Sequence, residues 1–375
     1  MKKKLRLLIV DDNVSERKRF AARLNGTGLS AAVAVSPPTD MDAEKLLALR
    51  PDAILIDYQL NEQGDAATRV AYRGPTLAAA VREQTESIPL VLLTRPAILN
   101  LTALHASPSL ISTAFDEIMV KDDLQSNAEN ACHELDRLSL GFKKLAGVKA
   151  RTWDSIVRLL KASKEQSEFL RRADPPAGIL SEAPWNVSAP TDPIKRRWIV
   201  SDVAQWIRHV VLKYPGILYS PLHAATRLGL TLESFERDDV QAFFRPAKYK
   251  GVFSPAEGRW WAGELILEGR RFLARQRMRD VALGDFSEAW KKARKGTLQR
   301  AKCNSSGASS ADAVCYVLNE PVLREQSLPY RPDSRPACME EARVSFKAIR
   351  ETDRYDERLF PPDARGLLRG IEVSA

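Results

Sequence analysis

Short apolar runs in the first 140 residues alternate with segments whose apolar side chains recur every three to four positions. Three of the runs lack polar alternation, which is typical of parallel strands covered on both faces, whereas the other segments predict amphipathic helices. This order predicts an α/β fold with a doubly wound, five-stranded parallel sheet. We expect strands at 5–10, 31–35, 53–57, 90–94 and 117–120, and helices at 15–24, 40–49, 76–84, 97–112 and 122–138.

Polar side chains stand at the carboxyl ends of four of these strands: Asp11 and Asp12, Asp57, Thr94 and Lys121. In open α/β sheets, ligands bind at this edge. Three converging carboxylates repel one another unless a hard cation lies among them, and oxygen ligands suit Mg²⁺. A carboxylate beside such an ion can attack a phosphoryl group, while a hydroxyl and an ammonium stabilise the phosphoryl oxygens. The pattern therefore predicts phosphoryl chemistry with Asp57 as nucleophile.

Four segments carry a family resemblance: LLIVDDN (Leu7–Asn13), DAILIDYQL (Asp52–Leu60), LVLLT (Leu90–Thr94) and IMVKDD (Ile118–Asp123). In this order, each on its expected strand, they resemble the CheY-like receiver domain of two-component response regulators over residues 4–138. The resemblance implies that a histidine kinase or phosphotransfer protein phosphorylates the aspartate of the third strand. The implied roles are Mg²⁺ binding by Asp11, Asp12, Asp57 and the backbone carbonyl of Gln59, phosphoryl acceptance by Asp57, and a response to the phosphoryl group by Thr94 and Lys121.

Several positions depart from the family pattern. The loop 61–73 is longer than usual, and Gly74 stands at the position where the next helix begins. Three interpretations of this loop are open: a lid over the site, a contact with a partner, or a tolerated insertion. Arg95 replaces a small residue after the threonine, Asp122 replaces a proline after the lysine, and Ile118 stands where an aromatic side chain is common. The alternative to an active receiver is a degenerate one that keeps only the fold.

The region after the receiver shows two further patterns. Apolar residues recur at helical spacing through 133–172, which predicts either a continuous stem that supports a homodimer or two ordinary helices. Five prolines within 174–193 predict a semi-extended linker. We therefore divide the chain into a receiver domain at 1–138, a helical connector and Pro-rich linker at 139–194, and an output domain at 195–375.

The charge of the chain is unevenly distributed. The net charge is +9, yet residues 1–150 hold 19 basic and 19 acidic side chains, so the excess lies entirely in the remainder, together with all seven Trp. The apolar run at the N-terminus is interrupted by Arg6 and ends at Asp11, which is unlike an export signal. Four Cys do not make a disulfide scaffold, and the apolar stretches are shorter than a membrane span. We expect a cytoplasmic protein without membrane contact.

The output domain is predicted to be mainly α or α+β. A clear amphipathic helix covers 195–213, residues 221–244 have helix-turn-helix spacing, and 248–261 would supply a wing, which together resemble a winged helix-turn-helix loosely. The would-be recognition helix, however, carries four acidic side chains and one basic one, whereas a helix that enters DNA past phosphates should not be negative.

The strongest basic segment is 270–302, with eleven Lys and Arg against three Asp and Glu. Interleaved apolar residues predict helices with one basic face that binds DNA or an acidic protein partner, or that is merely solvated. Cys303, Cys315 and Cys338 lack the spacing of a typical zinc site. No P-loop, nucleophile elbow or HExxH motif occurs in the sequence, so the only chemistry implied is that of the receiver.

These observations predict a response regulator that accepts a phosphoryl group on Asp57 and thereby controls its output domain. One output is DNA-binding transcriptional control, which the positive charge favours. The other is a protein-interaction or signalling effector that does not bind DNA, which the acidic recognition helix favours.

Overall fold

The computed structural model describes residues 3–61, 70–95, 114–148, 152–176, 193–213, 215–278, 285–294, 296–308, 310–330, 340, 342–352, 355 and 357–373. The predicted helix 97–112, most of the loop 61–73, most of the linker 174–193 and Cys338 lie outside these residues. The chain packs as two compact units, residues 1–159 with 176–207, and residues 160–175 with 208–375. This division differs from the predicted one, since the helix at the start of the predicted output domain packs in the first unit.

The first unit is built on a parallel sheet of five strands in the order β2-β1-β3-β4-β5. The strands are β1 (Leu5–Val10), β2 (Ser30–Val35), β3 (Ala53–Asp57), β4 (Leu90–Thr94) and β5 (Glu117–Val120). All residues of β3 and β4 are buried, as expected for strands covered on both faces. The predicted fold class of this part of the chain is confirmed, because this strand order is that of flavodoxin-like sheets.

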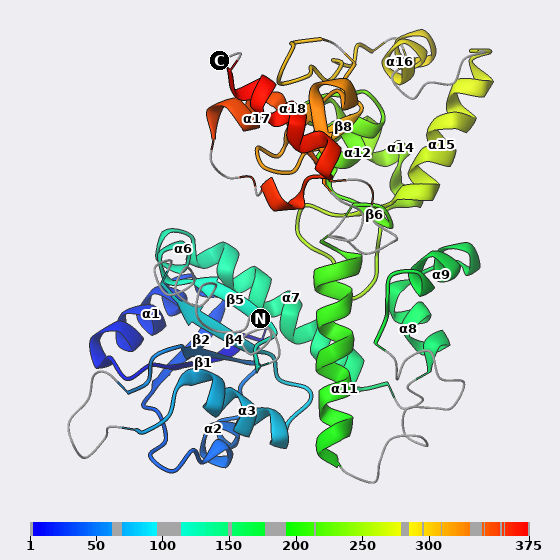
Figure 1. Cartoon of the computed structure of the whole chain (residues 1–375). Helices are drawn as coiled ribbons and strands as arrows, with labels where there is room; N and C mark the ends of the chain where they lie inside the picture. The colour runs from blue at the N-terminus through cyan, green and yellow to red at the C-terminus, as the bar shows by residue number, and fades with distance from the viewer. Residues whose placement is uncertain are drawn as a thin grey trace. The chain divides into compact units, whose positions relative to one another are not determined.

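Helices cover both faces of this sheet, as Figure 1 shows, with α2 and α3 on one face and α1, α6 and α7 on the other. Their bounds are α1 (Val14–Gly26), α2 (Ala43–Ala48), α3 (Gly74–Gln84), α6 (Lys121–Ser126) and α7 (Ala128–Ala146). The pattern at 133–172 forms no continuous stem: α7 ends at Ala146, and α8 (Trp153–Leu160) and α9 (Lys164–Arg171) follow as separate helices.

A buried ion pair ties the helix α11 (Pro193–Trp206) to the sheet of the same unit. Arg82 on α3 pairs with Asp116, which precedes β5, and both side chains are almost fully buried. The other oxygen of Asp116 accepts a hydrogen bond of 2.7 Å from the Ser201 hydroxyl on α11, and its first oxygen also accepts the Leu90 backbone N–H at 2.7 Å. Asp116 thus joins α3, β4 and α11 at the edge of the sheet opposite to the carboxyl ends of the strands.

The helical part of the second unit has an aromatic core. It contains β6 (Leu218–Tyr219), α12 (Pro221–Arg227), α13 (Leu232–Glu236), α14 (Asp238–Phe243), β7 (Trp260–Trp261), α15 (Ala262–Arg275) and α16 (Phe286–Arg294). Phe235, Phe244, Phe272, Phe286 and Trp290 are buried together in one cluster. Phe272, Phe286 and Trp290, the aromatic side chains of the basic segment 270–302, are therefore part of this core.

The predicted winged helix-turn-helix is matched only in part: α12, a turn at Gly229 and α13 follow one another as expected, with Ala225 and Phe235 buried. The second helix of the proposed helix-turn-helix is divided at Arg237 into the short helices α13 and α14. The wing is also absent, since β7 pairs with β6 ahead of α12, and the loop 248–261 is closed by a single bridge between Lys248 and Trp260. Trp260 therefore pairs on both sides, with Lys248 in its own loop and with Tyr219 of β6.

The C-terminal part of the second unit is a small mixed sheet in the order β10-β11-β8-β9. Its strands are β8 (Ala313–Cys315), β9 (Glu320–Val322), β10 (Ser327–Pro329) and β11 (Arg343–Ser345), covered by α17 (Phe346–Glu351) and α18 (Pro362–Val373). Cys303 and Cys315 are buried and unbridged, and they accept weak hydrogen bonds from backbone N–H groups. Within the described parts of the chain, no helix is both long enough and apolar enough to cross a bilayer.

Candidate functional site

The carboxyl ends of β1 and β3 bring three carboxylates together. Val10 pairs with Ile56 across these strands, so Asp11 and Asp57 leave the sheet side by side. Oxygen atoms of Asp11, Asp12 and Asp57 lie within 4.8 Å of one another. Among the described residues, this is the one group of acidic, His or Cys side chains with the geometry of a metal site. The structure thus brings the three predicted acidic residues to one point.

Lys121 is the cation of this site. It begins α6 directly after β5, and its ammonium lies 2.9 Å from an oxygen of Asp11, 2.9 Å from Asp57 and 2.8 Å from Glu16. The side chain is almost entirely buried. One ammonium therefore holds three carboxylates, and it can later contact an oxygen of any group attached to Asp57.

Thr94 ends β4 beside β3, since Asp57 pairs with the preceding residue, Leu93. Its side chain is fully buried, and its hydroxyl oxygen has no hydrogen-bond partner among the described residues. Burying an unpaired hydroxyl costs about 1–3 kcal/mol. The vacant donor at this strand end suits a ligand oxygen.

Burial and charge set the protonation of this cluster in opposite directions. Burial raises the pKa of Asp57 to about 6, against the lowering effect of the Lys121 ammonium and with a further increase from the Asp11 carboxylate. Burial also raises the pKa of Asp11. For Glu16, burial is outweighed by the hydrogen bond and charge of Lys121 and the contact with Arg95, so its pKa is lowered. The pKa of Lys121 is raised because Asp57 and Asp11 outweigh the effect of its burial.

Glu16 is a member of the site that sequence reasoning missed. It lies in the first turn of α1, which Asn13 caps by accepting the backbone N–H groups of Ser15 and Glu16. Besides Lys121, it pairs with Arg95, the residue that replaces the usual small one. Its position could have indicated this role. Glu16 lies in the first turn of the helix that follows β1, and this turn is at the same edge of the sheet as the strand-end carboxylates.

Gln59 donates its backbone N–H to Asp57 at 3.2 Å. The role of its carbonyl as a metal ligand stays a prediction. Of the other departures from the family pattern, Ile118 and Asp122 are exposed, on β5 and at the start of α6.

Gly74 opens α3 against the backbone of Asp57. A Cβ atom at this position would lie 2.1 Å from the carbonyl oxygen of Asp57, and the Gly74 N–H donates to the Tyr58 carbonyl at 2.9 Å. Only glycine fits here, which agrees with its assignment as the helix-opening glycine.

We expect Gly74→Ala to lower the free energy of unfolding by about 1–3 kcal/mol, because the backbone around Asp57 must move to admit a methyl group. Urea denaturation measures the change. Gly26→Ala is the matched control, since a Cβ there meets no atom within 4 Å. Equal stability of Gly74→Ala and the wild type would contradict the close contact.

Comparisons with known proteins give structural similarities only. No protein-family model and no curated protein matches the chain. The receiver domain of the putative response regulator NarL from Mycobacterium tuberculosis is 19% identical and covers 35% of this chain and 98% of its own, with a TM-score of 0.26. The BeF₃-activated receiver domain of RstA from Klebsiella pneumoniae is 22% identical, and the match covers 31% of this chain and 85% of that domain, with a TM-score of 0.23. The RcsB response regulator from Salmonella typhimurium is 20% identical, and the match covers 45% of this chain and 76% of RcsB, with a TM-score of 0.27.

The strand order and the strand-end side chains of the first unit together decide its fold. The sheet is parallel throughout and has the order β2-β1-β3-β4-β5. Asp57 lies at the end of its third strand beside Asp11 and Lys121. The first unit of this chain has the fold of a CheY-like receiver domain.

Proposed function

We propose that the chain is a response regulator whose Asp57 accepts a phosphoryl group from a histidine kinase or a phosphotransfer protein. A carboxylate oxygen of Asp57 attacks the phosphorus of a phosphohistidine, forms an O–P bond and breaks the P–N bond, and the imidazole leaves. The carrying observation is that Asp57 lies between the Lys121 ammonium at 2.9 Å and the strand end with the unpartnered Thr94 hydroxyl. Lys121 and Thr94 would bind the phosphoryl oxygens.

Mg²⁺ is the cofactor that this proposal includes, held by Asp11, Asp12 and Asp57 and by the carbonyl of Gln59. Three carboxylates with oxygen atoms within 4.8 Å are a hard, all-oxygen donor set, which suits this ion. When bound, it would neutralise charge on the transferred group. Arg17 supports the arrangement, since its guanidinium binds the carbonyl of Asp11 at 2.7 Å and fixes the backbone at the acidic pair.

Incubation of the full chain with phosphoramidate and Mg²⁺ tests this proposal. We expect a phosphoprotein whose adduct is labile to hydroxylamine, as an acyl phosphate is, and which Asp57→Ala lacks. Asp136→Ala, an exposed carboxylate on α7, is the matched control and should be labelled like the wild type. A chain that takes up no label, or an adduct that persists in Asp57→Ala, overturns the assignment of the acceptor.

For the output, we propose that the exposed basic side chains of α15, α16 and the residues that follow them bind duplex DNA. Phe272, Phe286 and Trp290 face the core, while the exposed basic residues here are Arg270, Arg271, Arg275, Arg277, Lys291, Lys292, Arg294 and Lys302. The two helices meet where Lys292 donates to the carbonyl of Gln276 at 3.3 Å. The acidic residues of α13 and α14 argue against these helices as readers of bases, so phosphate contacts would dominate.

A salt titration of binding to a duplex of arbitrary sequence separates this output from an acidic protein partner. Binding that rests on about five phosphate contacts should show a slope of log K against log salt near −4 to −5. The paired substitution Arg275→Gln and Lys292→Gln should reduce the slope by about two, whereas Lys250→Gln, an exposed control, should not. No binding at low salt would favour the protein-interaction effector.

A further inference from the structure

The second unit contains a cavity of about 340 Å³ between the first turn of α12 and the strand β8 with its following turn. This volume is roughly ten times the ~30 Å³ that one water molecule occupies in the liquid. It lies in the lower part of the range of small-molecule pockets, about 300–1,000 Å³. The cavity therefore has room for a small organic molecule, and its lining defines which kind.

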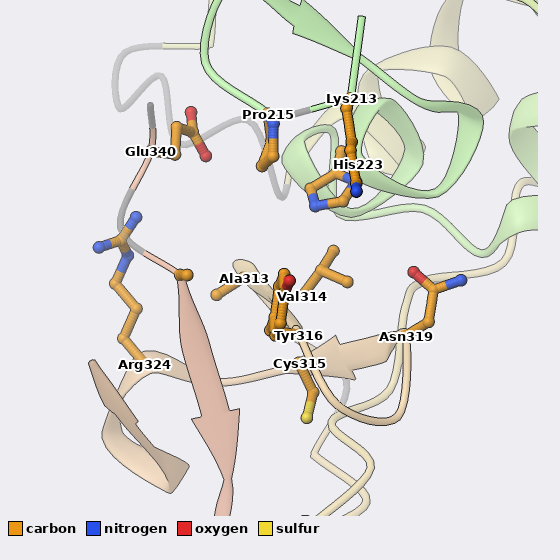
Figure 2. A pocket seen from close by; sticks show the side chains of 11 residues that line it. Lys213, Pro215, His223, Ala313, Val314, Cys315, Tyr316, Asn319, Arg324 and Glu340 are labelled. Carbon is orange, nitrogen blue, oxygen red and sulfur yellow. The ribbon is translucent and has the colours of Figure 1, made fainter. Parts of the chain in front are cut away.

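One end of the cavity carries a single uncompensated positive charge. Figure 2 shows Lys213 and His223 together at this end. Lys213 has no acidic partner among the described residues. His223 is held by a 2.8 Å hydrogen bond between its Nδ1 and the Ser220 hydroxyl, and its pKa is lowered to about 4 by burial and by the charge of Arg259. At neutral pH this end thus offers one cation and one uncharged imidazole.

The opposite end has no excess positive charge. Figure 2 shows Arg324 and Glu340 there, across the cavity from Lys213. Glu340 accepts a hydrogen bond from the hydroxyl of Tyr219, and Arg324 lies 3.5 Å from Asp312. Arg324 and Glu340 offer hydrogen-bond donors and acceptors, and the charge of Arg324 is already balanced by Asp312. A neutral polar group matches this end better than an ion does.

The wall between the two ends is mainly apolar, although Tyr316 and Asn319 also line the cavity. Pro215 lies on one side of the cavity, and Val314 on β8 lies on the other (Figure 2). Their side chains offer no hydrogen bonds, so they favour a hydrocarbon or aromatic body over a chain of polar groups. Figure 2 shows Lys213 and Arg324 at different ends of the cavity.

We propose that this cavity binds a small organic monocarboxylate with an apolar body and a neutral polar group at its far end. The carboxylate would pair with Lys213 and accept a hydrogen bond from His223, and the polar group would contact Arg324 and Glu340. A phosphate dianion fits less well, because one ammonium, which is itself exposed, and a neutral imidazole offer only one positive charge to its two negative charges. This site is independent of the phosphoryl chemistry of the first unit.

Calorimetric titration of the full chain with 4-hydroxybenzoate tests the proposal, since this molecule has a carboxylate, a ring and a hydroxyl in line. We expect saturable binding, a loss of affinity of about tenfold or more for the amide analogue 4-hydroxybenzamide, and a smaller loss for benzoate. A charge-assisted hydrogen bond justifies the tenfold figure. Inorganic phosphate should not compete.

Three variants assign the binding to this cavity. Lys213→Met should weaken 4-hydroxybenzoate about tenfold and leave 4-hydroxybenzamide unchanged, and Val314→Phe, which fills the space, should abolish the binding of both. Lys250→Met, an exposed control in the same unit, should bind like the wild type. The proposal fails if 4-hydroxybenzoate, benzoate and 4-hydroxyphenylacetate all fail to bind, or if Lys213→Met retains full affinity and selectivity. Unfolding midpoints verify that each variant is folded.

Discussion

Lys121→Met is expected to lower the free energy of unfolding of the first unit by about 3–5 kcal/mol at neutral pH, because it leaves buried carboxylates without their cation. The ammonium now lies 2.8–2.9 Å from Asp11, Glu16 and Asp57, and methionine fills a similar volume without replacing the charge. Urea denaturation of the full chain measures the loss. Hydrogen exchange of the β1 and β3 amides assigns the transition to this unit.

The loss should depend on pH in a defined direction. The folded-state pKa of Asp57 is raised from 3.8 to about 6, so the folded chain binds a proton more tightly than the unfolded chain does. The contribution of this group to stability is therefore present below about pH 4 and is lost as the pH rises through about 6. Without Lys121 the pKa values of Asp57 and Asp11 rise further, so the deficit of the variant should shrink on acidification.

Lys45→Met is the control for this experiment. Lys45 also pairs with two aspartates, Asp40 and Asp42, but its side chain is exposed, so water screens the interaction and little stability should be lost. A loss in Lys121→Met no larger than in this control, or one that does not vary between pH 4 and pH 7, would contradict the cluster described above.

Asp116→Asn is the second substitution with a large expected effect. It removes the charge that balances Arg82, whose side chain is fully buried, and we expect a loss of about 3–5 kcal/mol. Asp116 also accepts hydrogen bonds from Leu90 and Ser201, of which an amide can replace only part. Urea denaturation of the full chain provides the measurement, since both partners belong to the first unit.

A double variant distinguishes an unpaired charge from lost packing. Arg82→Met combined with Asp116→Leu removes both charges, so it should regain most of the stability that Asp116→Asn loses. Ser201→Ala, which removes one hydrogen bond from α11, should cost only about 1 kcal/mol. If the double variant is as unstable as Asp116→Asn, the ion pair is not the cause.

The strands and the strand-end chemistry of the first unit were predictable because they are local. Buried parallel strands are continuous apolar runs, so β1, β3 and β4 were readable within a residue, as was the parallel fold class. Asp11, Asp57 and Lys121 were placed at one edge because each stands at the carboxyl end of a predicted parallel strand. The contact of Glu16 with Lys121 was not predicted, because it depends on the direction in which α1 leaves the sheet.

The second unit was harder to predict because its elements are short and depend on distant partners. The two residues of β7 pair with β6, about 40 positions earlier, whereas the local hairpin that the sequence predicted is reduced to one bridge between Lys248 and Trp260. The second helix of the helix-turn-helix predicted at 221–244 is interrupted at Arg237, which the spacing of apolar residues did not indicate. The packing of α11 against the first unit could not be predicted from local patterns either, since the hydrogen bond from Ser201 to Asp116 joins residues 85 positions apart.

The sequence by itself determined the parallel sheet, the position of Asp11, Asp12 and Asp57 at strand ends, and the location of the positive charge after residue 150, because each is a property of residues close together in the chain. Only the tertiary structure decided that Lys121 binds three carboxylates, that Gly74 must lack a side chain, and that Lys213, His223, Arg324 and Glu340 line one cavity. These depend on distances between residues far apart in the chain, and no local pattern encodes them.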